Sequence, residues 1–374
     1  MAFDSSKFYL GVNLGWLNIE YGHDLSFSFF EDWPPGIPEK TNFKKCIDAY
    51  FCHLNLRRIS VVRIWLWERL EGLEFLNTNQ FAYKDEKEFF ERIDIIMEAA
   101  SHYRIQVYWC LLDAAGLLKE NTQGELCTRQ REIFTKLVTQ SNVRNSFKDS
   151  ILRPFLNLLN KYIEMNVVFA IDMVNEIDWL WNKSSGVGLS RDAVEVFALD
   201  IFKCIKENCS RLDCTTSFAS YSQMTKEGGT SFIDFFDFHR YYSSKCCLFD
   251  SNHWTLPRWT NSKPCIIGEA GHYYADEKAD MDETKQSQSC GTLMKKALLR
   301  GYSGILLWRY SPVGGGRHCL LKFPGVDSFQ NELDSFITVA NTCQGSINAF
   351  NNYERAVWQE VKVSIQSIPS DRIP

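Results

Sequence analysis

The sequence predicts a single (β/α)8 barrel, and three observations support that fold class. Short apolar runs alternate with helix-like segments, which is typical of a parallel sheet with crossover helices. Eight such runs occur, and no change of composition and no linker rich in Pro, Gly and Ser divides them. The length of 374 residues fits one barrel, since barrels of this kind contain from about 200 to more than 400 residues.

The first half of the chain supplies four of the predicted strands. They lie at about 8–14, 59–65, 105–112 and 167–174, and each is almost entirely apolar. Helices are predicted between them at about 41–56, 84–102 and 147–165, with a shorter one near 128–139. Apolar residues at helical spacing, such as Phe89, Ile93 and Ile96, support the helical assignments.

The second half continues the same alternation. Strands are predicted at about 215–219, 235–239, 265–268 and 304–308, and helices at about 190–209, 282–300 and from 328 onward. We expect the barrel to occupy residues 1–345. Residues 346–374 end polar, with two prolines, and are expected to form a C-terminal tail that packs on the barrel or trails from it. A doubly wound open sheet is the rival fold, but no Gly-rich dinucleotide fingerprint follows the first strand.

Composition excludes several classes of function. The chain has 41 Lys and Arg against 46 Asp and Glu, a net charge of −5, which argues against a nucleic-acid partner. It contains no run of about 18 apolar residues, so no membrane span is expected. The N-terminus lacks the basic start and long apolar run of a signal peptide, and several of the 13 cysteines lie in apolar segments. We therefore expect a reduced, cytoplasmic protein; its oligomeric state is left open.

Two carboxylates stand where barrel enzymes place their chemistry, at the carboxyl-terminal ends of strands. The fourth strand runs into Glu176 and the seventh into Glu269, and these strands can face each other across the mouth of a closed barrel. Two carboxylates about 5 to 5.5 Å apart can carry out a two-step displacement at a sugar anomeric carbon. Repulsion between them raises the pKa of one, as a general acid near neutral pH requires.

Further polar and aromatic residues at strand ends suit the same chemistry. Asn175 can donate to a sugar 2-hydroxyl, and His239 can bind a substrate hydroxyl. Tyr241 lies two residues after His239, on the same face of an ideal strand. Arg63 on the second strand can pair with a carboxylate, and Trp308 can form a platform under the sugar.

Taken in order, these motifs resemble glycoside hydrolase clan A and, within it, the cellulase-like family 5 or a close neighbour. The similarity extends from about Phe8 to Pro312. It rests on the first strand (residues 11–16), Arg63, the pair Asn175-Glu176, His239 with Tyr241, Glu269 and Trp308, each at the matching strand.

The resemblance implies a retaining β-glycoside hydrolase that acts on a β-glucan, a β-mannan or another β-glycoside. It implies that Glu269 is the nucleophile, oriented by Tyr241 and Arg63, and that Glu176 is the acid and base. No cofactor or metal is expected, because the two carboxylates supply acid, base and nucleophile. One position departs from the family: the third strand ends without the usual His, and Asp113 stands in that neighbourhood. The exact family and the sugar therefore stay open.

Tryptophans follow several of the strands on the mouth side, and two or three of them are expected to line sugar subsites. The candidates are Trp16, Trp33, Trp65, Trp67, Trp179 and Trp181.

Two other functions remain as alternatives. The glycine-rich segment 313–318 after the last strand could bind phosphate, which would suit a barrel enzyme that acts on a phosphorylated metabolite. A barrel that binds carbohydrate without cleaving it is the other alternative. Metal chemistry is not expected, since the seven His are scattered and the Cys spacings lack the C-x2-C pairs of zinc sites.

Overall fold

The structure is a computed structural model. It describes residues 3, 7–15, 17, 24–29, 35–37, 39–56, 59–117, 125–182, 187–219, 232–242, 263–272, 294, 297–298 and 300–308. The glycine-rich segment 313–318, the expected helix from 328 and the tail 346–374 lie outside these residues, as does most of the helix expected at 282–300.

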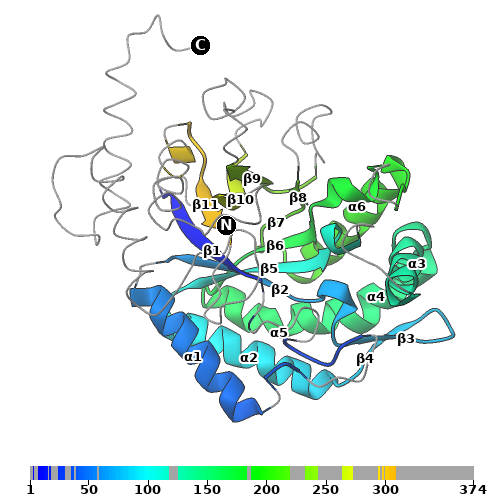
Figure 1. Ribbon diagram of the computed structural model, residues 1–374, viewed down its shortest axis with the longest axis horizontal. Helices are drawn as coiled ribbons and strands as arrows, with labels where there is room; N and C mark the ends of the chain where they lie inside the picture. Colours follow the sequence, from blue (N-terminus) through cyan, green and yellow to red (C-terminus); the bar gives the residue numbers. More distant parts are fainter. Residues whose placement is uncertain are drawn as a thin grey trace, which may run out of the picture.

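The described part of the chain contains one large parallel sheet (Figure 1). Its strands are β1 (Tyr9–Leu14), β2 (Val61–Trp65), β5 (Gln106–Asp113), β6 (Val168–Asn175), β7 (Cys214–Thr215), β8 (Ser217–Phe218), β9 (Phe236–Tyr242), β10 (Cys265–His272) and β11 (Gly304–Leu307). Their order across the sheet is β7-β6-β5-β2-β1-β11-β10-β9-β8.

The two ends of this sheet come together, because β7 and β8 are halves of one predicted strand. They are separated only by Thr216, yet β7 pairs with β6 and β8 pairs with β9. The sheet therefore curls into a barrel, and the predicted (β/α)8 fold is confirmed. All eight predicted strands are present, each shifted by a few residues at most.

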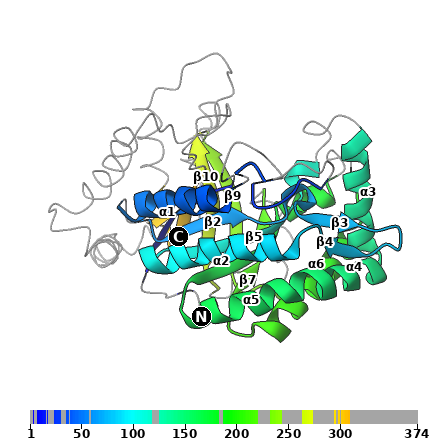
Figure 2. The ribbon, with the colours of Figure 1, turned by 90° about the horizontal axis from the view of Figure 1, so that it is seen from below.

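Helices cover the outside of the sheet (Figure 2). They are α1 (Lys40–Leu56), α2 (Glu86–Tyr103), α3 (Glu125–Thr139), α4 (Ser141–Phe147), α5 (Arg153–Glu164) and α6 (Arg191–Asn208). Helix α1 packs on α2, and α2 packs on α5. Side-chain caps set two of the starts: Asp85 accepts from the backbone N–H of Glu88, and Ser190 accepts from that of Ala193. No described helix is both long and apolar enough to cross a membrane.

Two details of the connections differ from the prediction. The helix expected from residue 147 begins at α4, and one wide turn, η3 (Lys148–Leu152), joins α4 to α5. Pro154 lies directly after that turn and has no N–H for the backbone ladder, which explains why the helix widens there. A hairpin of β3 (Leu73–Phe75) and β4 (Phe81–Tyr83) was not predicted, because three-residue strands carry too little alternation to be read.

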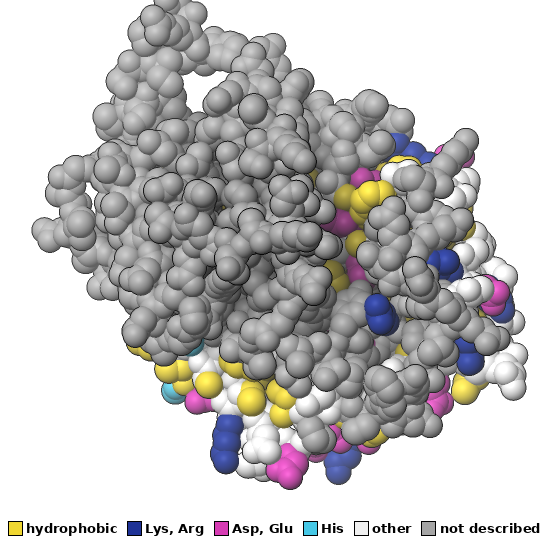
Figure 3. All heavy atoms as spheres, viewed as in Figure 1, with side chains coloured by type: hydrophobic (Ala, Val, Ile, Leu, Met, Phe, Trp, Pro, Cys, Tyr) yellow, Lys and Arg dark blue, Asp and Glu magenta, His cyan; other side chains and the backbone are white. Residues whose placement is uncertain are grey.

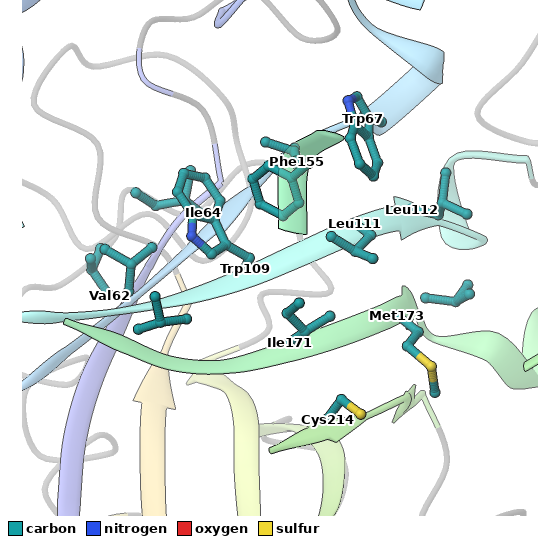
Figure 4. Close-up of a cluster of buried hydrophobic side chains, with 14 of the residues drawn as sticks. Val62, Ile64, Trp67, Trp109, Leu111, Leu112, Phe155, Ile171, Met173 and Cys214 are labelled. Carbon is teal, nitrogen blue, oxygen red and sulfur yellow. The ribbon is translucent and has the colours of Figure 1, made fainter. Parts of the chain in front are cut away.

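Each strand sends alternate side chains outward to the helices and inward to the barrel axis. The outward set forms the main core, and Figure 4 shows Val62, Ile64, Trp109, Leu111, Ile171 and Met173 in it. Trp109 meets Phe155 of α5 edge to face, with ring centroids 5.8 Å apart. The residues between them in sequence, such as Arg63 and Asp172, are buried inside the barrel.

The amino-terminal end of the barrel is filled by apolar side chains. The buried layer consists of Tyr9, Val61, Tyr108, Phe169, Ala170, Phe235, Ile266 and Leu306. The ring of Phe3 packs on this layer, with its centroid 4.6 Å from Phe235 and 5.0 Å from Phe169. We call this end the floor and the carboxyl-terminal end the mouth.

Candidate active site

The two predicted carboxylates meet at the mouth. Glu176 directly follows β6, and Glu269 lies in β10 beside His239 of β9 in the strand register. One oxygen of each carboxylate and one ring nitrogen of His239 lie within 4.8 Å of one another. Figure 3 shows acidic and hydrophobic side chains set back within this face of the molecule.

His239 links the two carboxylates. Its Nδ1 lies 2.8 Å from Oε1 of Glu176 and 3.5 Å from Oε2 of Glu269. Burial lowers the pKa of His239 to about 4, although the nearby Glu269 acts in the opposite direction. The imidazole is therefore neutral at neutral pH and can share one proton with Glu176 without adding a charge.

Glu176 is held in a form suited to proton transfer. Its backbone is left-handed, with φ 52° and ψ 51°, a conformation that costs a non-glycine residue about 1–3 kcal/mol. Trp179, on the short helix η4 (Ile177–Leu180), donates from Nε1 to Oε2 of Glu176 at 2.7 Å. Burial raises the pKa of Glu176 to about 7, the hydrogen bond from Trp179 opposes that rise, and the charge of Asp113 adds to it.

Arg63 connects the carboxylates and amides beneath the mouth, and it is fully buried. Its Nη1 donates to Oε1 of Glu269 at 2.7 Å and to Oδ1 of Asn13 at 2.9 Å. Its Nη2 donates to Oδ2 of Asp172 at 2.7 Å and to Oδ1 of Asn175 at 2.8 Å. Burial disfavours its charge, but the surrounding acidic groups outweigh this effect and raise the pKa of Arg63 well above its usual value.

The backbone before Glu269 is irregular, since the register of β10 shifts between Ile267 and Glu269. Asn13 donates from Nδ2 to the Gly268 carbonyl at 2.8 Å. The Asp237 carboxylate occupies the space beside Gly268: a Cβ there would lie 2.1 Å from Oδ1 of Asp237. Tyr108 donates to Oδ2 of Asp237 at 2.7 Å, and burial, followed by the charge of Asp172, raises the pKa of Asp237 well above its usual value.

The amide of Asn175 lies between Arg63 and Asp113. It accepts from Arg63 through Oδ1 and donates from Nδ2 to Oδ1 of Asp113 at 2.9 Å. Asp113 also accepts from the backbone N–H groups of Ala115 at 3.0 Å and Gly116 at 2.8 Å. The end of the third barrel strand therefore carries a carboxylate where the resemblance led us to expect a histidine.

The mouth also carries an aromatic pair. Trp308 directly follows β11 and is partly exposed, with its ring centroid 5.5 Å from that of Trp65. A Cβ on Gly15 would lie 3.3 Å from the Trp308 ring, so glycine leaves space for this tryptophan. The side chain of Tyr241, and both Trp16 and Trp33, lie outside the described residues.

The tryptophans after the strands have different environments. Trp179 contacts Glu176, whereas Trp181 lies against Phe218 and under the guanidinium of Arg191. Trp67 is fully buried in the core beside Phe89, Phe147 and Phe155, so the expectation that it could line a sugar subsite is wrong. Its position near a strand end did not reveal that helices α2, α4 and α5 cover it.

Several partners in the site were missed by sequence reasoning. They are Asn13, Asp172, Trp179 and Ser217, which donates to Asp172 and accepts from the backbone N–H of Glu176. Asp172 left a signal, because it is the one charged residue in the apolar run 167–174. A charge in such a strand is costly to bury without a partner, so a pair with Arg63 could have been inferred.

One group of side chains among the described residues has the donor atoms for a metal ion. It consists of Glu176, His239 and Glu269. The sequence argument did not anticipate this grouping, because it considered only spacing along the chain. The same atoms are those that the paired-carboxylate chemistry requires.

No family model matches the chain, and no curated protein matches it either. Solved structures do match. They include a β-mannanase from the blue mussel Mytilus edulis, at 17% identity and TM-score 0.61, with 88% of this chain and 90% of that chain covered. An endo-1,4-β-mannanase from Eisenia fetida matches at 16% identity and TM-score 0.64, with 91% and 92% covered. A β-1,4-mannanase from the sea hare Aplysia kurodai matches at 16% identity and TM-score 0.62, with 90% and 93% covered. At these identities the likeness shows the fold, a barrel over nearly the whole chain.

Proposed function

We propose that this chain is a retaining β-glycoside hydrolase of clan A, close to family 5, that cleaves β-mannan. The observation that carries the proposal is the pair Glu176 and Glu269. Their oxygens lie within 4.8 Å of each other, which is close to the spacing of retaining enzymes and well below the 6.5 to 9.5 Å of inverting ones. Inverting enzymes need that larger gap for a water molecule.

The two carboxylates have different surroundings, and these support different roles. Arg63 donates to Glu269, which favours its ionised form as a nucleophile. Glu176 has a pKa of about 7 and can hold a proton for the leaving oxygen. In the first step Glu269 attacks the anomeric carbon while Glu176 protonates the departing sugar. In the second step Glu176 removes a proton from water, which releases the covalently bound sugar with its original configuration.

The substrate is inferred from two separate features. The matching solved structures are named as β-mannanases, which favours β-mannan over β-glucan. The partly exposed Trp308 beside Trp65 offers an aromatic face of the kind on which sugar rings stack.

Labelling with a panel of 2,4-dinitrophenyl 2-deoxy-2-fluoro-β-glycosides tests the nucleophile. We expect the intact mass to increase by one fluorosugar, with the label on Glu269 and the manno-configured reagent reacting fastest. The absence of any adduct, together with no turnover of mannan or aryl glycosides, would contradict the proposal. It would favour a barrel that binds sugar without cleaving it.

The role of Glu176 has its own test. Glu176→Ala is expected to lose about 10²–10⁴-fold in kcat/KM on substrates with poor leaving groups and far less on activated aryl glycosides. Azide should restore turnover of the activated substrate and yield a β-glycosyl azide. Equal losses on both kinds of leaving group would contradict the assignment.

A further inference from the structure

We propose that Asp113 is a positioning residue that aims the amide N–H of Asn175 at the 2-hydroxyl of the reacting sugar. The inference rests on the proposed function and assigns a role to the position where this chain departs from the family pattern. Asp113 reaches the substrate only through Asn175.

The partners of Asn175 determine which way its amide faces. Arg63 can only donate, so the atom 2.8 Å from its Nη2 has to be the amide oxygen. An ionised Asp113 can only accept, so the atom 2.9 Å from its Oδ1 has to be the amide nitrogen. One N–H of Asn175 is used by Asp113, and the amide has a second N–H to offer to a ligand.

Asp113 is itself held firmly. Its side chain is 5% exposed, and its two oxygens accept from the backbone N–H groups of Ala115 and Gly116. The next residue, Ala114, donates to the backbone carbonyl of Asn175 at 3.0 Å, and Asp113 is the register partner of Asn175 across β5 and β6. The carboxylate therefore ties both the backbone and the side chain of Asn175 to one rigid strand end.

The geometry requires a carboxylate and not its amide. Three N–H donors point at the two oxygens of Asp113. An asparagine at 113 would replace one oxygen by an NH2 group, which would face at least one of these donors. The Asn175 amide would then lose its partner or turn over and present its oxygen elsewhere.

The charge of Asp113 provides a second readout. It is among the groups that raise the pKa of Glu176, after burial. The general acid works while protonated, so activity falls as pH rises through that pKa. Neutralising Asp113 lowers the pKa of Glu176 and moves the alkaline limb of the pH profile to lower pH.

The experiment compares two substrates: an aryl β-mannotrioside, and its analogue that lacks the 2-hydroxyl on the sugar bearing the aryl group. For Asp113→Asn we expect kcat/KM on the full substrate to fall about 10- to 100-fold, as for other residues that orient a site group. We expect less than about a threefold loss on the 2-deoxy analogue. The double variant Asp113→Asn/Asn175→Ala should be no worse than Asn175→Ala alone. Asp85→Asn, which removes a similar backbone cap far from the mouth, serves as the control for stability alone.

Equal losses on the two substrates, or a further loss in the double variant, would overturn the inference while leaving the proposed hydrolase intact. If Asp113→Asn does not fold, Asp113→Glu keeps the charge but displaces the acceptor. It must then show the same selectivity for the full substrate without a shift of the alkaline limb. If the wild type hydrolyses neither substrate, the proposed function itself fails, and this inference fails with it.

Discussion

The two ends of the barrel interior are built from the same eight strands but from opposite chemistry. At the floor, rings from β1, β6 and the chain before β9 pack on one another, and Phe3 packs on them. At the mouth, a few residues further along the same strands, Arg63, Asp172, Glu269 and His239 are all buried. The floor gains its stability from removing apolar surface from water, whereas the mouth buries charges that stabilise only as a complete set.

This difference indicates what each end contributes. Removing part of the floor leaves a cavity, whose cost is the lost packing. Removing one member of the mouth leaves another charge buried without its partner, which costs more and depends on pH. Variants at the two ends should therefore differ in pH dependence as well as in size.

The largest effect on stability is expected at Arg63. Arg63→Met should lower the free energy of unfolding by about 3–5 kcal/mol at pH 7, because Asp172 and Glu269 lose their buried cation. The loss should be smaller at pH 4, where protonation can neutralise those carboxylates. Urea unfolding at both pH values measures this, and a loss independent of pH would remove the distinction between mouth and floor.

A floor variant should lose somewhat less. Phe169→Ala removes a fully buried ring that meets Tyr9, Tyr108 and Phe235, and should cost about 3 kcal/mol at either pH. The activity per folded molecule should stay within about twofold of wild type. Thermal unfolding together with kcat at 25 °C gives both quantities. A tenfold drop in kcat without unfolding would show that the floor transmits strain to the mouth.

At the mouth, removal of one acid should stabilise the protein. The folded-state pKa of Glu176, about 7, is raised above the usual 4.5, so the wild type loses stability as pH rises from about 4.5 to about 7. Glu176→Gln does not titrate and should be about 2 kcal/mol more stable than wild type at pH 8, with no advantage at pH 4. Glu98→Gln, on the exposed side of α2, is the matched control and should change neither value. A Glu176 variant no more stable at pH 8 than at pH 4 would contradict the raised pKa.

The smallest effect is expected at Phe3. Its ring is only partly buried and lies on top of the floor layer, so Phe3→Ala should cost about 1 kcal/mol, within the range for partial loss of a buried aromatic side chain. Chemical denaturation would detect this as a shift in midpoint. A loss as large as that of Phe169→Ala would show that Phe3 is part of the floor itself.

Most of the barrel could be predicted from the sequence because its strands are buried on both faces. Such strands form nearly continuous apolar runs, as at 59–65 and 167–174, and the chain allows few other ways to cover them. The small deviations lie where local chemistry competes with pattern. The turn η3 before Pro154 and the hairpin of β3 and β4 are examples.

The site was only partly predictable, for a related reason. Glu176, Glu269 and Arg63 lie in or directly after apolar strands, where a charge is conspicuous in the sequence. The contacts of His239 with Glu176 and of Asp113 with Asn175 depend on which strands are neighbours and in which register. That information is absent from any single segment of the chain. Asp172 and Trp67 show the two errors that follow: a buried ion-pair partner was overlooked, and a core tryptophan was assigned to the groove.

The close approach of Asp237 to Gly268 has a consequence for how this chain can vary. Any side chain at 268 would overlap the Asp237 carboxylate, and the next residue is Glu269, so the overlap would be relieved by moving the nucleophile. Positions 237 and 268 are therefore tolerant of change together and intolerant of change separately. In a mutational library, alanine at 268 should survive only beside a residue smaller than aspartate at 237. That pair of positions should covary among descendants of this sequence even though neither residue touches the sugar.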